Sequence, residues 1–89
     1  MKTGATSQEI ISEIVVYPNP SSDAFTITLP NTDNPKITFI LRDALGKIVL
    51  LNYDFTARKY SFGNELKPGM YLLEIQDKQT RKLVKLIKQ

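Results

Sequence analysis

Hydrophobic and polar residues alternate along most of the chain with a period of two. The clearest example is residues 25–29, where Phe25, Ile27 and Leu29 alternate with two threonines. Such alternation is typical of a β-strand with one buried and one solvent-facing side. The pattern predicts seven short strands, at residues 13–17, 24–29, 36–43, 47–54, 58–62, 70–77 and 80–88.

The same alternation indicates which side chains face the core. Phe25, Phe39 and Tyr71 each lie in an apolar row and are expected in the core rather than on a ligand-stacking surface. The fourth and fifth strands alternate less clearly, so their aromatic residues are not assigned to either side. In the last strand, Val84 and Leu86 alternate with lysines. The pattern therefore predicts that Lys85 and Lys88 face solvent.

Turn-forming residues separate the predicted strands. Asp43-Ala44-Leu45-Gly46 predicts a short hairpin turn in which Gly46 adopts positive φ. Lys67-Pro68-Gly69 predicts a type II turn, which favours Pro followed by Gly. The remaining turns are expected at residues 18–23, 30–35 and 77–80.

The order of these elements predicts the fold class. Short strands follow one another at intervals of roughly 8–12 residues, which is typical of an antiparallel sandwich or barrel. No segment between them has the pattern of a crossover helix, so a parallel sheet is not expected. Residues 1–12 are mostly small and polar and are expected to form a flexible linker. Residues 13–89 are expected to form one domain.

Composition excludes several kinds of chemistry. The 89 residues include no Cys, His or Trp, which excludes a disulfide scaffold, a cysteine nucleophile and the commonest general base. Asp43 could be a catalytic acid, but its place before Ala44-Leu45-Gly46 favours capping of the turn. The oxygen-bearing side chains of residues 31–34 lack the spacing of a calcium loop. The sequence therefore predicts a protein that is not an enzyme and has no metal or cofactor.

Positive charge is concentrated at the C-terminal end. The net charge is +3, yet residues 78–89 contain five basic and no acidic residues, while residues 1–77 contain seven basic and nine acidic ones. The basic segment could be an edge strand whose lysines discourage aggregation. Alternatively, a partner could pair with this edge by β-augmentation. Nucleic-acid binding is not expected, because five charges in one short segment provide only non-specific attachment.

The compartment depends on whether the chain is complete. Its apolar runs are far shorter than the roughly 20 residues of a membrane span, and its N-terminus has no apolar signal-peptide core. A complete protein of this sequence would be cytosolic. A fragment of a longer precursor could come from any compartment.

Four motifs occur in a characteristic order. They are Tyr17-Pro18-Asn19-Pro20, residues 41–47 (LRDALGK), residues 66–73 (LKPGMYLL) and residues 82–88 (KLVKLIK). In this order and spacing, the chain closely resembles the C-terminal sorting domain of proteins exported by the type IX secretion system of Bacteroidetes. The resemblance extends over residues 13–89.

The resemblance implies a fold and a function. It implies a seven-stranded, antiparallel Ig-like β-sandwich at the C-terminal end of a larger secreted protein, the cargo. The cargo would enter the periplasm through its own signal peptide. The domain would then be recognised by shuttle and translocon components of the outer membrane, which deliver the cargo to the cell surface or the medium. A sortase-like cysteine peptidase usually removes such a domain, and the cargo can then be joined to lipopolysaccharide.

The resemblance also implies roles for particular residues. The last strand and its lysines are associated with recognition by the secretion machinery; the corresponding residues are Lys82, Lys85, Leu86, Ile87 and Lys88. A second set matches positions expected to be architectural: Pro18, Asn19, Pro20, Asp43, Gly46, Gly69 and Tyr71. Cleavage is expected within residues 1–12 or just upstream.

Three alternatives remain open from the sequence. The domain could be a sugar- or protein-binding module at the cell surface, or an inert spacer between other domains. The last strand also leaves weak homodimerisation through a sheet edge open, since Leu83 and Ile87 lie on the opposite side from Val84 and Leu86.

Overall fold

The computed structural model describes residues 14–29, 37–55, 58–77 and 80–89. The linker predicted at residues 1–12 and the turn predicted at residues 30–35 lie outside the described residues. The turn predicted at residues 77–80 is described at its two ends. There the Asp77 N–H donates to the Thr80 carbonyl (3.0 Å), and the Thr80 N–H donates to Asp77 Oδ1 (2.8 Å).

The described residues form seven strands and no helix. Each strand corresponds to one of those predicted from the alternation, and the bounds differ by at most two residues. The strands are β1 (Val15–Tyr17), β2 (Phe25–Thr28), β3 (Ile37–Asp43), β4 (Ile48–Phe55), β5 (Lys59–Phe62), β6 (Gly69–Gln76) and β7 (Arg81–Lys88).

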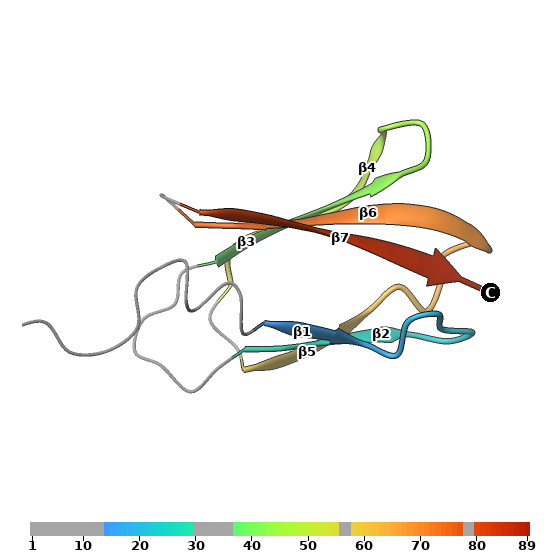
Figure 1. Ribbon diagram of the computed structural model, residues 1–89, viewed down its shortest axis with the longest axis horizontal. Coiled ribbons are helices and arrows are strands. Elements are labelled where there is room, and N and C mark those ends of the chain that lie inside the picture. The colour runs from blue at the N-terminus through green and yellow to red at the C-terminus, as the bar shows by residue number, and fades with distance from the viewer. Residues whose placement is uncertain (1–13, 30–36, 56–57, 78–79) are drawn as a thin grey trace, which may run out of the picture.

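The strands form two antiparallel sheets that face each other (Figure 1). The first sheet has the order β1-β2-β5, and the second has the order β4-β3-β6-β7. Hairpins join β3 to β4 and β6 to β7 within the second sheet, whereas β5 returns the chain to the first. The predicted seven-stranded, Ig-like β-sandwich is confirmed. The C-terminal strand β7 lies at one edge of the second sheet.

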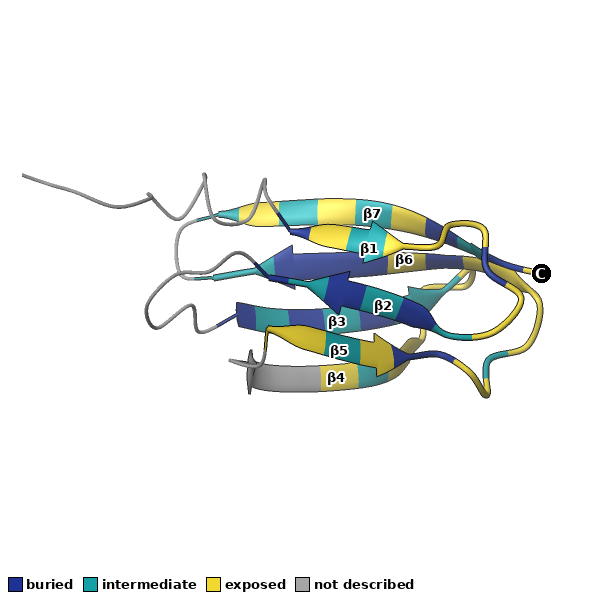
Figure 2. Cartoon of the chain, turned by 90° about the horizontal axis from the view of Figure 1, so that it is seen from below, coloured by how far each residue is buried: buried dark blue, intermediate teal, exposed yellow. Residues whose placement is uncertain are grey.

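The core lies between the two sheets and is formed by alternate positions of the strands (Figure 2). Phe25, Phe39 and Tyr71 are buried, which confirms the prediction for all three. Phe62 in β5 is also buried, and its ring stacks on Phe25 with ring centroids 5.6 Å apart. Apolar side chains from β2, β3, β5 and β6 therefore hold the sheets together.

The hairpin between β3 and β4 has the predicted turn chemistry. Asp43 Oδ1 accepts hydrogen bonds from the N–H groups of Leu45 and Lys47, each at 2.9 Å. Gly46 has φ = 90° and donates its N–H to the Asp43 carbonyl. Asp43 thus acts here as a turn cap, the role that its sequence context favours.

The type II turn predicted at Lys67-Pro68-Gly69 is wrong. Gly69 has φ = 153°, far from the roughly +80° that a type II turn requires, and it already pairs with Lys88 as the first residue of β6. The hydrogen-bonded turn lies earlier, where the Leu66 N–H donates to the Gly63 carbonyl. Pairing with β7 therefore determines the backbone at Gly69, whereas local sequence preference does not.

The prediction that Lys88 faces solvent is also wrong. Lys88 is 5% exposed and lies on the same side of β7 as Val84 and Leu86. The physical reason is the period of the strand: residues 84, 86 and 88 are two apart and must share a side. Lys85 lies on the opposite side and is exposed, as predicted.

Candidate functional site

The candidate site is β7, the basic C-terminal strand. It pairs with β6 along its whole length, from Arg81 opposite Gln76 to Lys88 opposite Gly69. Its side chains alternate between two sides. We call the side that faces the first sheet the inner side; it carries Lys82, Val84, Leu86 and Lys88. The outer side carries Arg81, Leu83, Lys85 and Ile87.

Lys88 anchors the end of the inner side. Its ammonium group donates hydrogen bonds to the carbonyl oxygens of Gly63 (2.6 Å) and Asn64 (3.1 Å). Both acceptors belong to the loop after β5, so this side chain ties β7 of the second sheet to the first sheet. A buried ammonium is costly unless its donors are engaged, and the two carbonyls provide that compensation.

Lys82 makes a similar contact at the other end of the strand. Its ammonium group donates to the carbonyl of Ile14, immediately before β1, at 3.2 Å. Between the two lysines, Leu86 is fully buried and Val84 packs against the core. Three of the five residues predicted for recognition (Lys82, Leu86 and Lys88) thus contact the body of the domain.

The outer side is the more exposed side of β7. Lys85 is exposed and Ile87 is half-buried, so these two of the five predicted residues are accessible from outside. Arg81 and Leu83 share this side and are exposed, although neither is among the residues predicted for recognition. The odd numbering that they share with Lys85 was the signal that could have identified them.

The free edge of β7 is partly occupied by the segment after β1. The Asn19 side chain donates to the Lys85 carbonyl (2.8 Å) and accepts the Ile87 N–H (3.0 Å). Ser21 continues this contact: its N–H donates to the Ile87 carbonyl, and its carbonyl accepts the Gln89 N–H. A partner could therefore add a strand only beside the first half of β7, which narrows the β-augmentation alternative.

The residues predicted to be architectural lie around this strand and the β3–β4 hairpin. Pro18 and Pro20 flank Asn19, and the Tyr17–Pro18 and Asn19–Pro20 peptide bonds are both cis. Tyr71 is buried, and its hydroxyl donates to the Lys67 carbonyl at 2.7 Å. Asp43 and Gly46 form the hairpin turn described above, and Gly69 starts the strand that pairs with β7.

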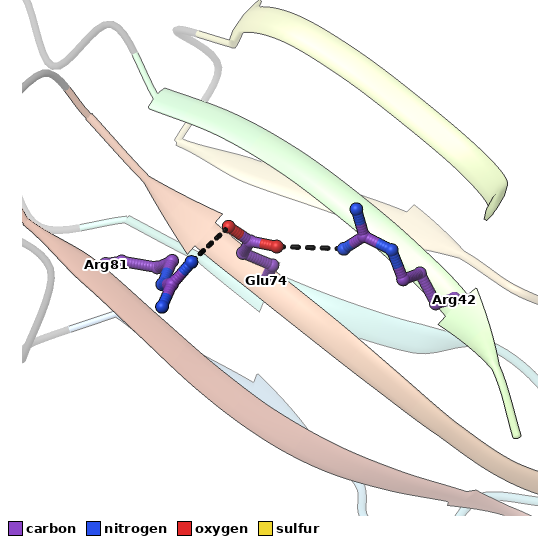
Figure 3. A network of polar contacts seen from close by, with 3 residues as sticks. All are labelled: Arg42, Glu74 and Arg81. Atoms are coloured by element: carbon purple, nitrogen blue, oxygen red, sulfur yellow. Dashed lines mark hydrogen bonds and ion pairs between the residues drawn. The ribbon is translucent and has the colours of Figure 1, made fainter. Parts of the chain in front are cut away.

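An ion-pair network lies on the outer face of the second sheet, next to β7 (Figure 3). Glu74 Oε1 accepts a hydrogen bond from Arg42 at 2.8 Å, and Arg81 lies 3.6 Å from the other carboxylate oxygen. The Glu74 side chain is only 11% exposed, whereas those of Arg42 and Arg81 are 33% and 64% exposed. The network joins β3, β6 and β7 on the side away from the core.

The described residues contain neither a metal cluster nor a membrane-spanning helix. Within residues 14–29, 37–55, 58–77 and 80–89, no three His, Cys, Asp or Glu side chains cluster in a way that could hold a metal ion. The described part of the chain also has no helix long and apolar enough to cross a membrane. The outer side of β7 carries apolar and basic side chains.

Comparison with known proteins identifies the family to which the domain belongs. Residues 15–89 match the family described as the secretion system C-terminal sorting domain. An endo-acting ulvan lyase of Formosa agariphila is 32% identical over 75 residues, which is 82% of this chain and 14% of the lyase. The chain thus spans only a small part of that relative. Together with the seven-stranded sandwich, the match shows that the chain belongs to the C-terminal sorting domain family, whose members direct proteins across the outer membrane by type IX secretion.

Proposed function

We propose that the secretion machinery reads this domain in its folded state, through the C-terminal strand β7. The supporting observation is the difference between the two sides of β7. The inner lysines bind carbonyls of the first sheet and its adjoining segments, while Lys85 and Ile87 point outward. In this proposal, Lys82, Leu86 and Lys88 support recognition by fixing the strand, and Lys85 and Ile87 make contact.

The proposed partners follow from membership of the family. A cargo protein is attached upstream of the domain, and shuttle and translocon components of the outer membrane bind the domain. The domain itself is non-catalytic, and its destination with the cargo is the cell surface or the medium. A sortase-like cysteine peptidase cleaves within residues 1–12 or just upstream, where small polar residues suit an exposed substrate.

The proposal is tested with a reporter protein that carries a periplasmic signal peptide and is fused upstream of all 89 residues. In a bacterium with type IX secretion, the fusion is expected in the medium or on the cell surface. The same reporter without the domain is expected to stay in the periplasm. Retention of both proteins would contradict a sorting role, and so would equal export of both. Mass spectrometry of exported cargo locates the cleavage site, and intact residues 1–12 would contradict the proposed position.

A further inference from the structure

The outer face of the second sheet is largely apolar although it is exposed. Directly opposed residues in neighbouring strands point to the same side, so the register identifies its rows. One row runs Leu51, Ile40, Glu74, Leu83, and the next runs Arg42, Leu72, Lys85. Met70 and Ile87 oppose each other on the same side. The exposed fractions of its apolar side chains are considerable: Leu51 42%, Met70 46%, Leu72 38% and Leu83 53%. We call this surface the outer sheet face.

The corresponding face of the first sheet is different. Its described rows contain hydroxyl side chains that bind one another, such as Thr26 with Ser61 (3.3 Å) and Thr28 with Tyr17 (3.1 Å). Lys59 lies beside Thr28. An ordinary solvent-facing sheet surface is polar in this way. Contiguous exposed apolar surface, in contrast, marks an interaction site.

The charges on the outer sheet face indicate which partner fits it. Arg42 and Lys85 lie in these rows, and Arg81 follows in the row of Gln76. Glu74, the carboxylate of the first row, is already bound by Arg42 and Arg81. A hollow of about 250 Å³ lies beside the network; its lining includes Arg42, Met70, Leu72 and Lys85, and the carboxylate of Asp43, which the turn N–H groups bind. Arg42, Arg81 and Lys85 outnumber Glu74 and Asp43, so the face presents a small surplus of positive charge around apolar side chains.

We propose that the outer sheet face docks onto a partner protein whose surface is apolar at its centre and carries carboxylates opposite Arg81 and Lys85. This proposal rests on the proposed function and specifies the chemistry of the machinery component that reads the domain. A second copy of the chain would bring like charges together, which opposes association.

The test uses the reporter fusion with four single substitutions. Leu72 is 38% exposed, and Leu72→Glu places a carboxylate between Arg42 and Lys85, where a carboxylate-bearing partner would be repelled. Its control is Val15→Glu, at a position 52% exposed on the first sheet. Lys85→Glu reverses an outer charge, and its control is Lys59→Glu, which makes the same change on the first sheet. The free energy of unfolding of each purified chain is measured in urea.

Leu72→Glu and Lys85→Glu are expected to lower the secreted fraction at least about tenfold, because each lowers the positive charge of the face and adds a carboxylate that meets the partner's carboxylates. The two controls are expected to stay within about twofold of the unchanged fusion, since ordinary surface substitutions cost little. Unfolding free energies within about 0.5 kcal/mol of the unchanged chain show that lost export is not lost folding.

Three outcomes would refute the proposal that the outer sheet face docks onto a partner protein. Equal export of all four variants would refute it while leaving the sorting function intact, because the unchanged fusion is still secreted. Export that falls only in proportion to lost stability would refute it as well. Co-sedimentation of the purified chain with vesicles of phosphatidylethanolamine and phosphatidylglycerol, abolished by Leu72→Glu, would assign the face to a membrane instead. Failure of the unchanged fusion to leave the cell would refute the sorting function itself.

Discussion

The ammonium group of Lys88 lies 2.6 Å from the carbonyl oxygen of Gly63. The contact joins the penultimate residue of the chain to the loop that follows β5, and so connects the two sheets at the C-terminal end of the sandwich. The final strand of the domain therefore contributes to the fold as well as to its surface. Truncation of this strand would test both contributions at once, whereas single substitutions separate them.

Replacement of Lys88 by Met is expected to destabilise the domain. Met retains an apolar stem of similar length but removes the three donors, which leaves the Gly63 and Asn64 carbonyls without this partner. Buried acceptors that lose a charged donor cost about 1–3 kcal/mol. Urea unfolding of the purified domain measures the change. Lys85→Met on the same strand is the control and should change stability by less than about 0.5 kcal/mol.

Loss of the Asn19 side chain is expected to loosen the edge of β7. Asn19→Ala removes both hydrogen bonds to the strand, at the Lys85 carbonyl and the Ile87 N–H, and should cost about 1–2 kcal/mol. Amide hydrogen exchange at Ile87 should accelerate accordingly. Ser22→Ala changes an exposed residue of the same loop and should leave the Ile87 exchange rate unchanged. Equal exchange rates in the two variants would show that Asn19 does not hold the strand.

Substitutions at two glycines with nearly equal φ distinguish the cost of backbone strain from the cost of a steric clash. Gly63 (φ 87°) and Gly46 (φ 90°) both adopt a conformation that disfavours other residues. A Cβ on Gly63 would lie 3.1 Å from Leu66 Cδ1 and 3.2 Å from Phe25 Cδ2, whereas one on Gly46 would meet nothing within 4 Å. Gly63→Ala should therefore destabilise the domain by roughly 1 kcal/mol more than Gly46→Ala. Calorimetry measures the stability of both variants. Equal losses of stability would indicate that the Leu66 and Phe25 side chains move aside at little cost.

The ion-pair network should contribute little to stability. Glu74→Gln keeps the shape of the side chain and removes its charge, and Arg42 and Arg81 remain partly solvated. The loss in unfolding free energy should be below about 1 kcal/mol, because solvent screens such pairs. Urea unfolding of Glu74→Gln beside the unchanged domain provides the measurement. A loss of several kcal/mol would show instead that the network is a main support of the second sheet.

The strands were predictable from the sequence because strand alternation and turn-forming residues are local features of the chain. Alternation with a period of two identified all seven strands, and Asp43 and Gly46 identified the β3–β4 turn. The pairing order of the strands depends on contacts between distant segments, which the alternation does not predict. The incorrect turn at Gly69 has the same origin, since pairing with Lys88 determines its backbone.

The sequence pattern identified β7 as the candidate site, but it did not distinguish the roles of the inner and outer sides of the strand. Lysine was expected to face solvent, and Lys82, Lys85 and Lys88 were therefore treated alike. Their spacing separates them, because Lys82 and Lys88 share the inner side with Leu86 while Lys85 does not. The carbonyls that accept the inner lysines come from residues 14, 63 and 64, and only the folded structure brings these to β7.

The central claim is that the inner side of β7 stabilises the fold while the outer side contacts the secretion machinery. Three charge reversals test this claim most directly. Lys82→Glu, Lys85→Glu and Lys88→Glu are each measured for secretion of the reporter fusion and for unfolding of the purified domain. Lys85→Glu should abolish most secretion with stability unchanged. Lys88→Glu should lose about 2 kcal/mol or more, because a carboxylate replaces a donor facing two carbonyls, and Lys82→Glu should lose less. Unchanged stability in all three, with equal losses of secretion, would contradict the account.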